Sequence, residues 1–72
     1  MKVYSYRITS KLDYRTTSKG KGWTSLQKLL WQLSAWGFLP KSARLVQVRD
    51  NEYIYETETS IITIIVKDIP LK

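Results

Sequence analysis

The chain contains neither cysteine nor histidine. Without cysteine it forms no disulfide bond and offers no thiolate ligand to a metal. Without histidine it also lacks the commonest transition-metal ligand and the commonest general base of enzymes. We therefore expect a protein that is not an enzyme and that uses no cofactor.

Long apolar runs are missing as well. No segment approaches the roughly 20 apolar residues that span a bilayer. The first residues, MKVYSYR, alternate polar and apolar side chains instead of forming the apolar core of a signal peptide. We expect a cytoplasmic protein with no membrane partner. We also expect its 72 residues to form a single domain, 1–72. The core of so short a chain is small, so a second chain would add to its stability.

Positive charge outweighs negative charge and is unevenly distributed. The net charge is +6. Residues 1–49 contain ten Lys and Arg against one acid, Asp13 (+9), whereas residues 50–72 contain two Lys against five acids (−3). This polarity favours an anionic partner for one face, either nucleic acid or an acidic protein surface. The alternative is that the net charge serves only to keep a small domain soluble.

Three segments have the composition and spacing of β-strands. Residues 2–12 and 43–50 alternate polar with apolar side chains, and residues 53–67 are rich in β-branched and aromatic residues throughout. As one strand, the last segment would span about 50 Å at about 3.3 Å per residue, which is too long for so small a domain. We predict a bend or a break near Thr57–Ser60.

The middle of the chain predicts one helix over residues 25–36. Thr24 has the character of an N-cap, and Gln27 three residues later completes a capping-box pattern. Gly37 suits the left-handed residue that ends many helices, and Pro40 prevents continuation. An apolar stripe with helical spacing lies between these ends. It consists of Leu26, Leu29, Leu30 and Leu33.

Together these elements predict an α+β fold in which one helix packs on a small, mainly antiparallel sheet. The expected order is β-α-β-β, with the last strand long, bent or split. Residues 13–22 lack periodicity and contain two glycines among lysines and hydroxyl side chains, so we expect a flexible loop there.

The segment RTTSKGKGWTS, residues 15–25, permits two interpretations. It does not match the phosphate-binding loop G-x-x-x-x-G-K-[ST], because its glycines are two apart and Gly22 precedes Trp23. Its lysines could still bind an anion at the helix N-terminus, where free backbone N–H groups favour negative charge. The alternative is a solvated hinge with incidental lysines.

Nucleic-acid binding through phosphate contacts is the leading functional hypothesis, because Lys and Arg that contact the backbone read little sequence. The predicted contact residues are Arg7, Lys11, Arg15, Lys19, Lys21, Lys41 and Arg44. The alternative is a protein-interaction module, such as an inhibitor or accessory factor that docks on an acidic protein surface or adds a strand to a partner sheet.

Glu56 and Glu58 are the only residues that keep an enzymatic alternative open. On one strand they would project from the same face, where two carboxylates could hold Mg²⁺ in a nuclease. Ordinary cross-strand pairing with Arg7, Lys11 or Arg49 is the alternative.

Several aromatic residues also have two interpretations. Trp31 lies off the leucine stripe, so it either packs under a loop or contacts another molecule. Tyrosines at alternating positions either form the core face of the sheet or stack bases of a single strand. They are Tyr4, Tyr6, Tyr53 and Tyr55.

The segment IITIIV, residues 61–66, is apolar on both strand faces. At an exposed edge it would invite strand pairing, so we expect a second copy to cover it in a symmetric homodimer. Trp31, Ile61 and Ile65 are the predicted interface residues. The alternative is a central strand, covered on one side by the helix and on the other by the long loop.

Overall fold

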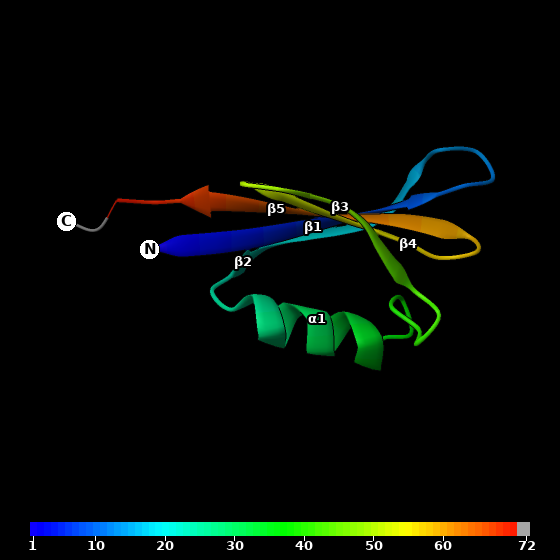
Figure 1. The fold of residues 1–72 in the computed structure, drawn as a ribbon, viewed down its shortest axis with the longest axis horizontal. Helices are drawn as coiled ribbons and strands as arrows, with labels where there is room; N and C mark the ends of the chain where they lie inside the picture. The colour runs from blue at the N-terminus through cyan, green and yellow to red at the C-terminus, as the bar shows by residue number, and fades with distance from the viewer. Residues whose placement is uncertain (71–72) are drawn as a thin grey trace.

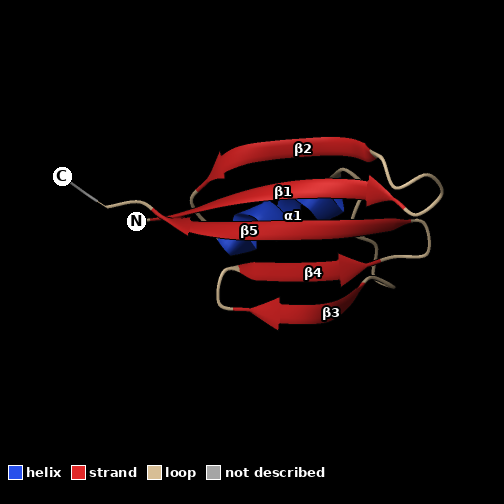
Figure 2. Ribbon diagram, turned by 90° about the horizontal axis from the view of Figure 1, so that it is seen from above, coloured by secondary structure: helices blue, strands red, loops and turns tan. Residues whose placement is uncertain are grey.

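Five antiparallel strands and one helix make up the part of the chain that the computed structural model describes, residues 1–70 (Figure 1). In chain order the elements are β1 (Lys2–Ser10), β2 (Thr16–Trp23), α1 (Leu26–Ala35), β3 (Arg44–Arg49), β4 (Glu52–Glu56) and β5 (Ser60–Asp68). In the sheet the order is β2-β1-β5-β4-β3, so the last strand of the chain is the central one (Figure 2).

The predicted α+β class is confirmed, since one helix packs on an antiparallel sheet. The predicted order β-α-β-β is wrong, because the expected loop over residues 13–22 contains most of strand β2, and the observed order is β-β-α-β-β-β. Alternation of apolar side chains does not predict β2, because the strand lies at an edge of the sheet and most of its residues are exposed. A strand that buries so little needs no alternation of apolar side chains.

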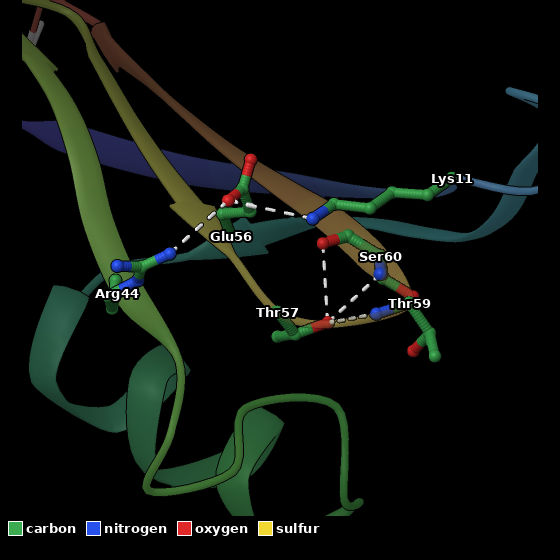
Figure 3. Close-up of polar contacts among 6 residues, drawn as sticks. All are labelled: Lys11, Arg44, Glu56, Thr57, Thr59 and Ser60. Carbon is green, nitrogen blue, oxygen red and sulfur yellow. Dashed lines mark hydrogen bonds and ion pairs between the residues drawn. The ribbon is translucent and has the colours of Figure 1, made fainter.

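The predicted break near Thr57–Ser60 is confirmed, since β4 ends at Glu56 and β5 begins at Ser60. Thr57 is buried and holds the turn together (Figure 3). Its Oγ1 accepts hydrogen bonds from the N–H groups of Thr59 (3.3 Å) and Ser60 (3.0 Å), and donates one to the Ser60 carbonyl (3.3 Å). The Thr57 side chain therefore bonds backbone groups of the turn that have no partner strand.

The helix begins one residue later than the capping-box pattern predicts. Ser25, not Thr24, is the N-cap, and its Oγ accepts a hydrogen bond from the Lys28 N–H (3.3 Å). Gln27 therefore lies too early in the first turn to complete the predicted box. At ten residues, α1 is short, and none of the described residues forms a helix long and apolar enough to cross a bilayer.

The predicted helix end is confirmed. Gly37 has φ of +84°, the left-handed conformation that glycine adopts without strain. The Gly37 N–H donates to the Ser34 carbonyl (3.0 Å), and the Phe38 N–H donates to the Leu33 carbonyl (2.9 Å). These two bonds satisfy carbonyls that the helix end would otherwise leave free.

The core lies between α1 and the strands β1 and β5. Its buried residues are Tyr6, Ile8, Leu29, Leu33, Ile62 and Ile64. Trp36 borders this core, where its ring centroid lies 6.3 Å from that of Tyr6 and 6.4 Å from that of Trp23. Leu12, the last residue of the segment 2–12 that alternation predicts as a strand, is 95% exposed because β1 ends at Ser10 and Leu12 lies in the turn that follows.

Candidate functional site

The sheet has one covered face and one open face. α1 lies against the covered face, and within residues 1–70 no helix or strand lies on the opposite side, which we call the open face (Figure 1). Cross-strand pairing arranges the side chains of the open face in rows. One row runs from β2 to β3 through Lys19, Arg7, Thr63, Ile54 and Gln47.

Positive charge gathers on the β1–β2 side of the open face. Arg7 on β1 lies directly opposite Lys19 on β2, and Lys21 follows two residues further along β2. All three side chains are exposed. They surround a shallow hollow of about 380 Å³, which we call the cationic hollow. It is lined by Ser5, Tyr6, Arg7, Lys19, Gly20, Lys21 and Ile65.

The three cations of this hollow have no counter-charge nearby. No carboxylate among residues 1–70 lies within 4.0 Å of Arg7, Lys19 or Lys21. Like charges directly opposite each other on a sheet destabilise it. An anion held between the cations would remove that cost, so the geometry favours an anionic ligand.

Two glycines of β2 lie at the cationic hollow and next to it: Gly20 lines the hollow, and Gly22 follows Lys21. Gly20 pairs with Tyr6, and a Cβ atom on Gly20 would lie 2.5 Å from Tyr6 Cε1, so the tyrosine ring occupies the space of the missing side chain. Gly22 has φ of +91° at a β-bulge, where β2 has two residues opposite the single residue Ser5. The glycine spacing therefore serves strand packing, and most of the expected loop before the helix N-terminus is strand β2.

Two further cations share one carboxylate at the other end of the open face. Glu56 Oε1 lies 3.5 Å from Lys11 Nζ and 3.8 Å from Arg44 Nη2 (Figure 3). The predicted pairing of Glu56 with Lys11 is confirmed, Arg44 is an additional partner, and Arg7 and Arg49 are not within ion-pair distance. Because Glu56 offsets part of their charge, Lys11 and Arg44 attract an anion less strongly than the cations of the hollow.

Glu58 does not share a strand with Glu56, because it lies in the turn between β4 and β5. Both line a second hollow of about 420 Å³ together with Lys11 and Arg44, so the positive and negative charges there balance. Within the described part of the chain, no three acidic, His or Cys side chains gather in a way that could hold a metal ion.

The remaining predicted contacts lie apart from the cationic hollow. Arg15 lies in the turn between β1 and β2, with its Nε 4.0 Å from Asp13 Oδ2. Lys41 is exposed in the loop between α1 and β3. The seven predicted cations therefore form no single surface: Arg7, Lys19 and Lys21 meet around the cationic hollow, whereas Lys11 and Arg44 line the second hollow with two carboxylates.

The tyrosines of the strands face the helix. Tyr6 is buried in the core, and Tyr4, Tyr53 and Tyr55 pack against it. Burial raises the pKa of Tyr55, and the neighbouring Tyr53 phenol raises it further. The interpretation as a core face is confirmed, and that of a platform for stacked bases is wrong.

The three predicted interface residues do not share a surface. Trp31 is 71% exposed on α1, whereas Ile61 and Ile65 pair with residues of β1 and β4 on the open face of β5 and are half-buried. β5 is the central strand, with α1 on one face, as the alternative supposes, but most of the expected covering loop forms strand β2 at an edge of the same sheet. The sequence also offered no signal for Ser5 and Gly20 in the cationic hollow, since neither side chain is charged or aromatic.

Comparison with known proteins finds no match to any family model, curated protein or solved structure. The geometry and the charges of the open face therefore provide the basis for a proposed function.

Proposed function

We propose that this protein is a small, basic, non-enzymatic module of the cytoplasm that binds nucleic acid through phosphate contacts. The observation that carries the proposal is the cationic hollow, where exposed Arg7, Lys19 and Lys21 meet and no carboxylate of residues 1–70 is within ion-pair distance. Phosphate groups repeat along every nucleic acid and need only cations and donors for binding. Such contacts fix position without reading bases, so the binding is sequence-independent.

A protein-interaction module is the second candidate, favoured by the apolar middle of the open face. Ile61 and Ile65 on β5 are half-buried there without a covering element among residues 1–70, next to Ile54 on β4. An acidic protein surface could cover both the isoleucines and the cationic hollow, and a second copy of the chain is one possible partner. If a protein is the partner, replacing Ile61 and Ile65 with serine should lower the affinity for it as strongly as replacing Lys19 and Lys21.

The test of nucleic-acid binding is a salt series with fluorescently labelled DNA and RNA probes, followed by anisotropy. Each phosphate contact contributes about −0.9 to the slope of log affinity against log salt concentration. Three contacts, from Arg7, Lys19 and Lys21, should therefore give a slope of about −2.7. The affinity should then fall about 40-fold between 50 and 200 mM salt. Absence of binding to every probe at low salt would reject the proposal and favour the protein partner.

Replacing Glu56 with glutamine is expected to strengthen nucleic-acid binding. The substitution frees Lys11 and Arg44 from their shared carboxylate, and both then become available to phosphates. The slope of the salt plot should steepen from about −2.7 toward about −4.5. Stability should change by less than about 1 kcal/mol, because partly exposed ion pairs contribute little.

The matched control is Glu58→Gln, which makes the same change in charge without releasing an ion pair that the described residues show. It should steepen the slope less than Glu56→Gln does. Equal slopes for the two variants would show that Lys11 and Arg44 make no phosphate contacts. Cleavage of the probe by the wild-type protein with Mg²⁺, abolished in Glu56→Gln, would instead indicate a nuclease.

A further inference from the structure

Among residues 1–70, no strand carries an aromatic ring on the open face, and Tyr14 in the β1–β2 turn is the single exposed ring on that side of the sheet. Proteins that hold single strands combine a cationic track with exposed rings on which successive bases stack. Here the strand tyrosines face α1, and Trp23, Trp36 and Phe38 are grouped on the same covered side. A duplex needs no such rings, because its bases are already stacked and its phosphates lie on the outside.

The turn between β1 and β2 is the second observation. Residues 11–15, which we call the hairpin tip, extend past the end of the β1–β5 pairing and rise on the side of the sheet away from the helix (Figure 1). Leu12 is 95% exposed and Tyr14 is 75% exposed, so both apolar side chains project into solvent. The tip also carries Arg15, whose side chain is 85% exposed.

Hydrogen bonds hold the hairpin tip although four of its five residues are exposed. The Ser10 N–H donates to the Arg15 carbonyl (2.9 Å), and the Tyr14 N–H donates to the Ser10 carbonyl (2.9 Å). The Leu12 N–H donates to Ser10 Oγ (3.2 Å). Tyr14 has φ of +57°, a conformation that costs an aromatic residue free energy. Backbone strain and exposed apolar side chains in one hydrogen-bonded turn are typical of a segment that contacts another molecule.

We infer that the ligand of the cationic hollow is a DNA duplex and that the hairpin tip enters its major groove; this inference depends on the proposed function. The major groove of B-form DNA is about 12 Å wide and admits a two-stranded β-ribbon, whereas the A-form groove of RNA is too narrow. Arg7 and Ser10 are three residues apart on β1, or about 10 Å, and Leu12 lies two residues further along, in the turn. The hollow can therefore hold phosphates beside the groove while Leu12 meets the thymine methyl groups within it.

The experiment measures the anisotropy of labelled 20-mers of one sequence as DNA duplex, RNA duplex and single-stranded DNA at 50 mM salt. The DNA duplex should bind about tenfold more tightly than either other probe, since only it admits the tip. The double variant Leu12→Ser/Tyr14→Ser should lose about fivefold to tenfold in affinity for the DNA duplex. Its salt slope should not change, because no phosphate contact is removed.

Leu45→Ser is the control, because Leu45 is exposed on β3, away from the β1–β2 side. It should bind the DNA duplex as the wild type does. Equal or tighter binding of RNA duplex or single-stranded DNA, or an unchanged affinity of the tip variant, would overturn the inference while the proposed function stands. Failure of all three probes to bind would reject the proposed function itself.

Discussion

Replacing Lys19 and Lys21 with glutamate should reduce nucleic-acid affinity by on the order of 100- to 1000-fold at 50 mM salt. The variant loses two phosphate contacts and gains two repulsions, each worth about 1 kcal/mol between solvated charges. The stability of the fold should not fall, because Lys19→Glu places a carboxylate directly opposite Arg7. In the wild type, two cations lie opposite each other at this position. Thermal unfolding should therefore show unchanged or slightly raised stability.

The matched control for this variant is Lys2→Glu/Lys28→Glu. It makes the same change in net charge at two exposed residues, one at the start of β1 and one on α1. Alternation along β1 places Lys2 on the covered side of the sheet, as it does Tyr4 and Tyr6. If the control loses as much affinity as the Lys19/Lys21 variant, binding depends on total charge and not on the cationic hollow.

Replacing Leu33 with alanine should destabilise the protein by about 2–5 kcal/mol. Leu33 is 0% exposed, and truncating a buried leucine removes its contacts and leaves a cavity. A chain of 72 residues is stable by only about 4–11 kcal/mol, so the loss is a large fraction of the total. The midpoint of thermal unfolding, followed by circular dichroism, should fall by on the order of 10 to 40 °C.

Leu45→Ala provides the comparison, because it makes the same chemical change at a residue that is 47% exposed. It should lower the unfolding midpoint by only a few degrees, since about half of the side chain already contacts solvent. Similar losses in both variants would mean that the core does not lie between α1 and the central strands.

The elements that sequence patterns predicted correctly have strong local causes. The leucine stripe specifies the buried side of α1, and Gly37 with Pro40 specifies where the helix ends. The length of the segment 53–67 alone required the break that Thr57 provides. In each case the physical reason lies within a few consecutive residues, where side-chain spacing and backbone preference act directly.

The candidate site was only partly predictable. Seven cations were expected to contact the ligand, and pairing of Glu56 with Lys11 was anticipated, but nothing in the sequence showed that Arg44 shares that carboxylate or that Lys41 lies apart. Nor did the sequence show that Gly20 makes room for the ring of Tyr6. These relations join residues that are distant in the chain, so they depend on strand pairing.

The sequence by itself determined that the chain lacks thiol and imidazole chemistry, carries excess positive charge, forms one amphipathic helix and pairs it with antiparallel strands. Only the tertiary structure decided that residues 16–23 form an edge strand, that β5 is central, and that Arg7, Lys19 and Lys21 share one hollow. The reason is that helix formation and turns depend on neighbours in sequence, whereas the order and register of strands depend on partners far along the chain.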